Sequence, residues 1–195
     1  TTLGTEGSDF TAAILAFCLD AEEVVIWKDV PGMMNADPKF FPDAELLNIV
    51  SYDEAIELAF YGAKVIHPKT IQPLKKKNIP LQIKSFLTPN RKGSVITNNA
   101  EDNFDVPSFI IKEDQILISI SDENLAFVVE AHMSHIFSIL AKHRVGVNLM
   151  QNSAVSFSIC VDNDRYKIPL LIKDIKQFFK VLYNDKVNLF TIRHY

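Results

Sequence analysis

The sequence predicts an α/β protein in which a partial parallel-sheet layer is followed by a ferredoxin-like βαββαβ domain. Strand and helix patterns alternate over residues 8–84, as in a layered domain with a mostly parallel sheet. After residue 110 the pattern becomes β-α-β-β-α-β, which is the ferredoxin-like order. Residues 89–109 are polar and rich in turn-forming residues, which indicates a connector. We therefore expect domains at 1–88 and 110–195, and the final strand also fits a second, incomplete unit of the latter kind.

The composition is that of an ordinary globular protein and excludes several classes. The 195 residues are 48% hydrophobic and 23% charged, enough for one large or two small domains. The net charge of −4 provides no basic surface for nucleic acid or anionic membranes. No apolar run approaches the roughly 20 residues that span a bilayer. Cys18 and Cys160 lack metal-ligand spacing and suit a reducing compartment, so we expect a cytoplasmic protein without nucleic-acid or membrane partners.

A glycine loop opens the first predicted helix. Gly4 and Gly7 precede Ser8, which is a suitable N-cap for a helix over residues 8–20. Such a loop presents free N–H groups and the positive end of the helix dipole, so the segment is suited to bind a carboxylate or phosphate. An ordinary capped helix after a glycine turn explains the same pattern. The apolar face of this helix should consist of Phe10, Ile14, Phe17 and Cys18.

The next elements complete the first layer. Residues 24–27 form a continuous apolar run that is typical of a buried parallel strand. Ser51 and Glu54 form a capping box for a helix that ends near Tyr61. The remaining predicted elements are a short strand at 65–66, a helix from Pro68 to about Lys77 and a strand at 81–84. The lysines at the C-terminal end of this helix interact favourably with the helix dipole.

Apolar periodicity defines the elements of the second domain. The strands alternate at Ile116, Ile118 and Ile120, at Val145, Val147 and Leu149, at Val155, Phe157, Ile159 and Val161, and at Val187, Leu189 and Thr191. The helical stripes consist of Met133, Ile136, Phe137 and Leu140, and of Ile168, Leu171, Ile172 and Ile175. His132 and His135 lie one helical turn apart without a third ligand, so we expect two solvent-facing histidines and no metal site.

Four motifs in this order and spacing resemble the C-terminal half of the catalytic domain of aspartokinase, a member of the amino acid kinase family. They are Gly-Thr-Glu-Gly-Ser-Asp at 4–9, Trp-Lys-Asp-Val-Pro-Gly at 27–32, Asn-Ala-Asp-Pro-Lys at 35–39 and Phe-Tyr-Gly-Ala-Lys-Val-Ile-His-Pro at 60–68. The region from about residue 110 resembles the ACT regulatory region of the same enzymes. The family's upstream lysine-bearing glycine-rich segment is absent, so we expect the isolated chain to be inactive.

The resemblance implies site residues at the matching positions. It implies an aspartate-binding loop of Thr5, Glu6, Gly7, Ser8 and Asp9, and nucleotide contacts from Lys28, Asp29, Met34, Lys39, Lys64 and Val65. Thr5 stands where the family commonly has an arginine, and a hydroxyl cannot copy a bidentate guanidinium contact. Lys28, Met34 and Lys39 stand where threonine, tyrosine and arginine are common. An Asx-turn at Asp29 and a solvated surface lysine at Lys64 explain these two residues without a ligand.

The segment from Gly146 to Ser153 resembles the effector-binding loop of aspartokinase ACT domains. The implied effector contacts are Asn148, Gln151, Asn152 and Ser153, and an aspartate commonly stands at the position of Asn148. A turn that only connects two strands explains the same segment. The resemblance also implies an amino-acid effector, lysine or threonine, and a homodimer formed through the ACT region.

The resemblance implies an aspartate kinase that phosphorylates the side-chain carboxylate of L-aspartate with MgATP, so ATP and Mg²⁺ are the expected cofactors. Such an enzyme serves the biosynthesis of lysine, threonine and methionine and is feedback-regulated. Two alternatives remain at this point. One is a non-catalytic regulatory subunit or amino-acid-binding module, and the other is a different kinase of the same superfamily.

Overall fold

The computed structural model describes residues 7–100, 106–122 and 130–195. These residues fall into two compact units. Unit 1 contains the residues up to Ile111 together with Phe190–Tyr195, and unit 2 contains Lys112–Leu189. In the described part of the chain, no helix combines the length and the apolar character needed to cross a membrane.

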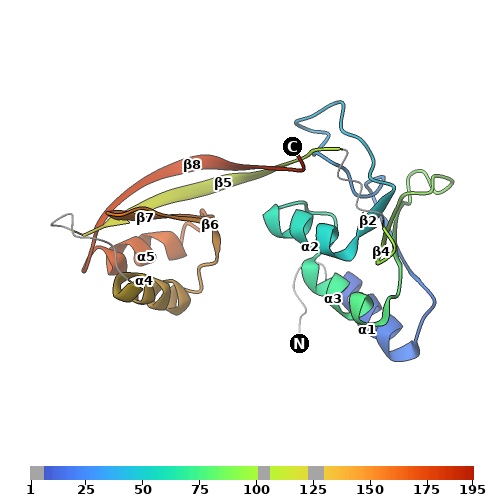
Figure 1. Ribbon diagram of the computed structural model, residues 1–195, viewed down its shortest axis with the longest axis horizontal. Helices are drawn as coiled ribbons and strands as arrows, with labels where there is room; N and C mark the ends of the chain where they lie inside the picture. The colour runs from blue at the N-terminus through green and yellow to red at the C-terminus, as the bar shows by residue number, and fades with distance from the viewer. Residues whose placement is uncertain (1–6, 101–105, 123–129) are drawn as a thin grey trace. The chain divides into compact units, whose positions relative to one another are not determined.

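Unit 1 is an α/β layer around a four-stranded sheet (Figure 1). Its sheet has the order β1-β3-β4-β2, in which β1–β3 and β2–β4 are parallel pairs and β3–β4 is antiparallel. The predicted α/β class is confirmed, and the sheet combines two parallel pairs of opposite direction. The elements are α1 (Gly7–Leu19), β1 (Val24–Lys28), β2 (Ile49–Ser51), α2 (Tyr52–Tyr61), α3 (Pro68–Lys77), β3 (Leu81–Ser85) and β4 (Ser94–Thr97).

Helix α1 packs on α3 and β1 through a different face from the predicted one. Its buried residues are Asp9, Ala13 and Ala16, while Ile14 and Leu15 are exposed. The alanines allow a close approach of the neighbouring elements, and Asp9 turns inward toward a lysine of β1. The prediction of an apolar face was therefore wrong. The helix also includes Gly7, so Ser8 lies in its first turn and is not its N-cap.

Two strand predictions in unit 1 also need correction. Val25 and Trp27 of β1 are exposed on one face of the sheet, so the apolar run is not buried on both faces. Residues 65–66 form no strand, because α2 passes through a turn directly to α3. The short strands β2 and β4 carry no long apolar run, and β4 lies inside the predicted connector.

The helix ends of unit 1 follow from their capping residues. Ser51 is the N-cap of α2, as predicted, and its Oγ accepts a hydrogen bond from the Glu54 N–H at 3.1 Å. Gly62 ends this helix with a φ of 126°, a conformation that favours glycine. His67 is the N-cap of α3, and the C-cap residue Asn78 has a left-handed backbone conformation. Tyr52, the first residue of α2, is buried in the core, and its hydroxyl donates to the Ile79 carbonyl at 2.6 Å.

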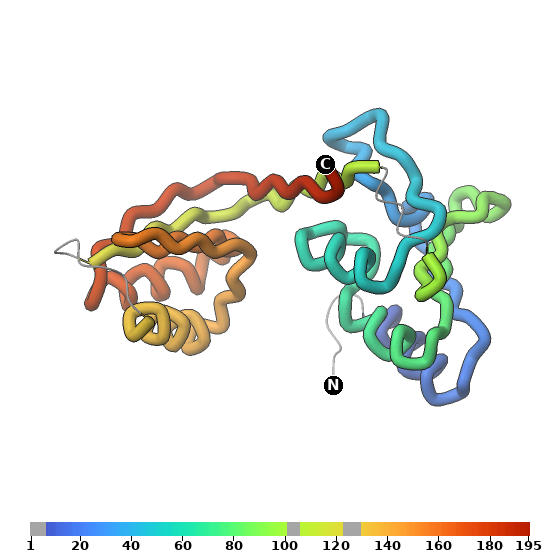
Figure 2. The backbone as a smooth tube through the Cα atoms, in the orientation of Figure 1, coloured from blue at the N-terminus to red at the C-terminus, as the bar shows by residue number. Residues whose placement is uncertain are grey.

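Unit 2 has the predicted ferredoxin-like order. Its elements are β5 (Ser108–Ser121), α4 (Glu130–His143), β6 (Val147–Asn152), β7 (Ser156–Asp162), α5 (Lys167–Ile175) and β8 (Lys180–Arg193). The first residues of β5 and the last residues of β8 belong to unit 1. The sheet order is β6-β7-β5-β8, and Figure 1 shows α4 and α5 on the same face of this sheet. The path of the β6–β7 hairpin can be followed in Figure 2. We call the face opposite the helices the open face.

A β-bulge at Asn148 changes the pattern of β6. Val147 pairs with the buried Val161, whereas Leu149 pairs with Cys160, the next residue along β7. The extra residue therefore moves Leu149 to the open face, where it is 47% exposed. The predicted alternation of Val147 and Leu149 on one face was wrong for this reason.

The histidines of α4 are partly buried, contrary to prediction. The His135 ring lies 4.4 Å from the ring of Phe178, and His132 lies 5.6 Å from Phe179, both measured between ring centres. The two histidines therefore pack on the aromatic residues that precede β8. By contrast, all four residues of the second predicted stripe, on α5, are buried as expected.

Candidate functional site

An ion pair joins two of the predicted motifs in unit 1. Lys28 Nζ, at the end of β1, donates to Asp9 Oδ2 in the first turn of α1 at 2.6 Å. The Asp9 side chain is 10% exposed and that of Lys28 is 23% exposed. Ser8 Oγ lies 3.5 Å from the other carboxylate oxygen of Asp9. The structure thus brings the predicted substrate loop and the first predicted nucleotide contact together.

The loop after β1 carries the next three predicted residues. Asp29 is exposed, and Met34 forms an isolated β-bridge with Leu46. Lys39 is exposed, and its N–H donates to Asp37 Oδ1 at 2.9 Å. Gly32 allows this loop to approach β4 closely, because a Cβ atom at residue 32 would lie 2.4 Å from Ser94 Oγ. The loop therefore lies against β4 and leaves Asp29 and Lys39 in water.

The predicted residues Lys64 and Val65 lie in the turn between α2 and α3. Lys64 is exposed, whereas Val65 packs against the core of unit 1. Thr5 and Glu6 of the predicted substrate loop lie outside the described residues. Among the described residues, no hydrogen bond or ion pair joins Lys64 to Asp9 or to the loop after β1.

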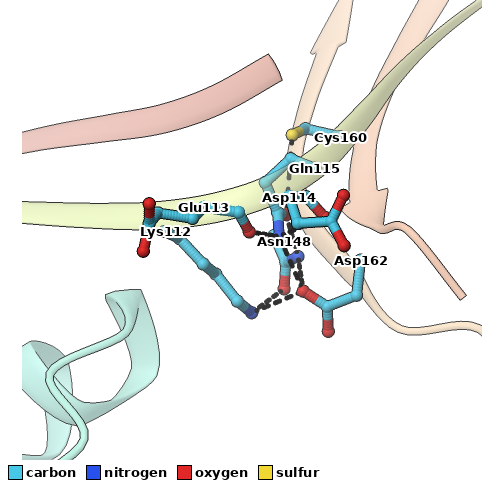
Figure 3. Close-up of polar contacts among 7 residues, drawn as sticks. All are labelled: Lys112, Glu113, Asp114, Gln115, Asn148, Cys160 and Asp162. Atoms are coloured by element: carbon cyan, nitrogen blue, oxygen red, sulfur yellow. Dashed lines mark hydrogen bonds and ion pairs between the residues drawn. The ribbon is translucent and has the colours of Figure 1, made fainter. Parts of the chain in front are cut away.

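A polar cluster surrounds the predicted effector residue Asn148 in unit 2. Figure 3 shows its amide group between side chains from β5 and β7. Asn148 Nδ2 donates to Gln115 Oε1 at 2.6 Å and to Asp162 Oδ1 at 3.0 Å. Asn148 Oδ1 accepts a hydrogen bond from Lys112 Nζ at 2.8 Å. Both amide hydrogens of Asn148 are thus used inside the protein.

The cluster contains one ion pair and one perturbed carboxylate. Lys112 Nζ lies 3.1 Å from Asp162 Oδ1, and Gln115 Nε2 donates to the same oxygen at 2.9 Å. Burial alone would raise the pKa of Asp162, but the hydrogen bonds from Gln115, Lys112 and Asn148 outweigh it and hold the pKa below its usual value. Burial raises the pKa of the adjacent Cys160 thiol, and the charge of Asp162 raises it further. The cluster therefore favours an ionised Asp162 beside a neutral thiol.

The other predicted effector residues lie at the far end of β6. Gln151, Asn152 and Ser153 are exposed, and Ser153 Oγ accepts a hydrogen bond from the Ser156 N–H at 3.1 Å, closing the β6–β7 hairpin. A strand rises by about 3.3 Å per residue, so Asn148 and Asn152 lie about 13 Å apart along β6. The structure does not bring all four predicted effector residues to one point.

Sequence reasoning missed the partners of Asn148, namely Lys112, Gln115 and Asp162. One signal was available in the sequence, because the polar Gln115 directly precedes the alternating isoleucines of β5. In the structure, Gln115 pairs with Asp162 of the neighbouring strand β7. Among the described residues, no three His, Cys, Asp or Glu side chains are grouped so that they could hold a metal ion.

The comparisons with known proteins agree with the motifs. A family model described as "Amino acid kinase family" matches residues 1–85. Lysine-sensitive aspartokinase 3 of Escherichia coli is 35% identical over 162 residues, which cover 83% of this chain and 36% of that protein. The predicted resemblance to aspartokinase is confirmed.

Two crystal structures of Escherichia coli aspartokinase III are similar to this chain. The R-state complex with aspartate and ADP has a TM-score of 0.81 and 30% identity, covering 97% of this chain and 44% of that chain. The T-state complex with lysine and aspartate has a TM-score of 0.80 and 31% identity, and the match covers 97% of this chain and 43% of that chain. The chain thus spans less than half the length of these aspartokinase III chains.

Proposed function

We propose that this chain is part of an aspartate kinase, which transfers the γ-phosphoryl group of ATP to the side-chain carboxylate of L-aspartate. The observation that carries the proposal is the contact of Asp9 with Lys28, because it joins the motif matched to aspartate binding with the motif matched to nucleotide binding. The similarity to aspartokinase III, which was crystallised with aspartate and ADP, supports the same reaction.

The residues of unit 1 suit a reaction that depends on positioning and charge. Phosphoryl transfer involves little covalent chemistry by the protein and much neutralisation of negative charge. The first turn of α1 provides backbone N–H groups and the Ser8 hydroxyl for a substrate carboxylate. Lys28, Lys39 and Lys64 provide positive charge for the phosphates of ATP.

ATP fits these residues, whereas the described chain does not form a Mg²⁺ site of its own. The carboxylate of Asp9 is already paired with Lys28, and the described residues contain no group of metal-binding side chains. Mg²⁺ commonly keeps several waters and binds through substrate phosphates, with one or two carboxylates. We therefore assign no step to residues of this chain acting through Mg²⁺.

We further propose that unit 2 is an ACT regulatory domain that binds lysine or threonine and forms a homodimer. Three features support this proposal. They are the ferredoxin-like order, the polar hairpin at 151–153, and the similarity to an aspartokinase crystallised with lysine. The edge strand β6 presents unpaired backbone groups beside the exposed Leu149 and Met150, and such an edge favours pairing with a second chain. The enzyme would then act in the cytoplasm in feedback-regulated biosynthesis of lysine, threonine and methionine.

The two alternatives are less well supported. The relative and the two crystal structures are all named aspartokinases, which argues against a different kinase of the superfamily. A regulatory module without kinase activity would not need the motifs of residues 1–85.

The activity can be tested with a full-length enzyme that contains this chain. A hydroxamate assay with ATP should detect an acyl phosphate from L-aspartate and none from L-glutamate or N-acetylglutamate. An acyl phosphate formed only from one of the other two acids would contradict the proposal, as would the absence of any product.

The effector site can be tested in the same enzyme. Calorimetric titration with lysine, threonine and methionine should show binding of lysine or threonine. Asn152→Ala should weaken inhibition by that amino acid and leave the uninhibited kcat unchanged, because the effector shifts a conformational equilibrium. Gln177→Ala, an exposed amide elsewhere in unit 2, is the matched control. Equal inhibition curves for both variants would contradict the pocket, and a monomer in light scattering would contradict the dimer.

A further inference from the structure

The C-terminal end of β8 makes a group of charged contacts with α2 inside unit 1. Arg193 Nε donates to Glu54 Oε1 at 3.1 Å, and its Nη2 donates to Glu54 Oε2 at 2.7 Å. Arg193 Nη1 donates to Glu57 Oε2 at 3.1 Å. The guanidinium carbon also lies 5.7 Å from the ring centre of Tyr61. We call these four residues the α2 clasp.

The clasp spans the whole length of α2. Glu54, Glu57 and Tyr61 have the spacing i, i+3 and i+7, which places them on one face from the first turn of the helix to the last. The contact with Glu54 is bidentate, the strongest and most directional form of an arginine–carboxylate pair. The side chains of Arg193 and Glu54 are only 21% and 18% exposed, so solvent screens this pair less than a surface ion pair.

The electrostatics agree with a stable contact. Burial alone would raise the pKa of Glu54, but the hydrogen bonds and charges of Arg193 and His194 outweigh it and lower the pKa below its usual value. The hydrogen bond with Glu54 likewise raises the pKa of Arg193. Glu54 therefore uses its carboxylate for the clasp, while its backbone N–H completes the Ser51 cap.

The last turn of α2 leads directly into the segment that contains Lys64 and Val65. Gly62 ends the helix, and the Ala63 N–H donates to the Leu58 carbonyl at 2.9 Å. Residues 63–67 belong to no helix or strand. The exposed Lys64 therefore lies between the last helical turn, where Tyr61 contacts Arg193, and Val65, which packs against the core of unit 1.

We propose that Arg193 is a positioning residue for nucleotide binding, and this rests on the proposed function of Lys64 and Val65. By holding α2 through Glu54, Glu57 and Tyr61, Arg193 fixes the turn from which Lys64 reaches the phosphates of ATP. The strand β8 is continuous, and its earlier residues belong to unit 2. The clasp itself lies within unit 1, where the last residues of β8 hold α2.

The chain offers well-matched variants for a test. Arg193→Gln removes the charge, and Arg193→Lys keeps the charge but loses the planar fork. The end of β8 stays attached through Phe190, whose ring lies 6.2 Å from that of Phe109 and 6.3 Å from that of Phe41. Asp53→Asn is the control, because Asp53 also lies on α2 but pairs with Lys75 of α3, away from the clasp.

The experiment measures ADP affinity by calorimetry and both KM values in a full-length enzyme that contains this chain. We expect Arg193→Gln to weaken ADP binding and raise the KM for ATP by about three- to tenfold, with a smaller effect for Arg193→Lys. The KM for aspartate should not change in either variant, and Asp53→Asn should leave all three values unchanged. If Arg193 had only a structural role, its replacement would lower the melting temperature and would change the KM values for ATP and aspartate to the same extent.

Two results would overturn the inference. One is an unchanged ADP affinity in both Arg193 variants. The other is a loss of ADP affinity in Asp53→Asn that equals the loss in Arg193→Gln. If Arg193→Gln does not fold, Arg193→Lys and Glu57→Gln decide the question by the same titration. ADP binding does not require turnover. An enzyme that forms no aspartyl phosphate would therefore contradict the proposed function, while the ADP titration still tests the role of Arg193.

Discussion

The two units place their charged side chains differently around the predicted ligand-binding residues. In unit 1, ion pairs join segments that are distant in sequence, as Asp9 joins Lys28 and Glu54 joins Arg193. Three predicted nucleotide contacts, Asp29, Lys39 and Lys64, remain exposed. In unit 2, the predicted effector residue Asn148 lies inside a closed group of hydrogen bonds with Lys112, Gln115 and Asp162.

This difference predicts different roles for the two sets of residues. A ligand that contacts Asn148 must first break hydrogen bonds that the protein already makes, and an unsatisfied polar group costs about 1–3 kcal/mol. A phosphate that approaches Lys39 or Lys64 displaces only water. We therefore expect the cluster around Asn148 to act as a frame for β6, and the exposed hairpin residues 151–153 to make the effector contacts.

The largest effect is expected from Thr5→Arg in a full-length enzyme that contains this chain. The family resemblance places an arginine at this position, and a charged hydrogen bond to a substrate carboxylate contributes about 1.5–3 kcal/mol. The KM for aspartate should therefore fall about tenfold or more. Steady-state kinetics with Thr5→Lys as a control would separate the guanidinium geometry from its charge. An unchanged or higher KM in Thr5→Arg would show that residue 5 does not face the substrate.

A smaller effect, on the free energy of unfolding, is expected when the ion-paired Lys28 of unit 1 or Lys112 of unit 2 is replaced. Lys28→Met leaves the carboxylate of Asp9, which is 10% exposed, without its partner. Breaking a fully buried pair costs 3–5 kcal/mol, and the partial exposure of Lys28 reduces our expected loss of unfolding free energy to about 2 kcal/mol. Lys112→Met is the matched change in unit 2. Because Asp162 is 65% exposed there, the expected loss is at most about 1 kcal/mol.

Urea unfolding of both lysine variants measures these losses directly. The comparison fails if Lys112→Met costs as much as Lys28→Met, since the two carboxylates would then depend equally on their lysines. Lys173→Met, an exposed lysine of α5, provides the baseline for losing a surface lysine.

Most of the fold could be predicted from periodicity, and the errors have local causes. The ferredoxin-like order followed from alternating and helical apolar patterns, which the sheet and its two helices reproduce. The bulge at Asn148 could not be predicted, because one extra residue in β6 has no compositional signal. The rotation of α1 was missed because Asp9 turns inward to Lys28, and apolar residues alone do not report such a pair.

The candidate site could be predicted only where its residues are contiguous in the sequence. The motif with Ser8 and Asp9, and the motif with Lys28, were recognised from their order and spacing. The contact between them, and the contact of Arg193 with Glu54, join residues far apart in the chain. Charge pairs of this kind depend on the tertiary fold, so neither partner shows a local pattern that identifies the other.

The smallest expected effect is the pH dependence of the pair formed by Lys112 and Asp162. Burial acts to raise the pKa of Asp162, but its hydrogen bonds lower the pKa below the usual value in the folded protein. The folded state thus binds this proton less readily than the unfolded chain. The resulting stability is present above the unfolded-state pKa and is lost as the pH falls through the folded-state pKa, in the range below about pH 4.

Urea unfolding of the wild type and Asp162→Asn at several pH values tests this expectation. The difference in unfolding free energy should be constant between about pH 5 and pH 7 and should shrink below about pH 4. Its size should stay within about 1 kcal/mol, because Asp162 is largely exposed. Asp185→Asn, which removes an exposed carboxylate of β8, should show no such change. A pH-independent difference for Asp162→Asn would mean that the hydrogen bonds of the cluster do not depend on the charge of Asp162.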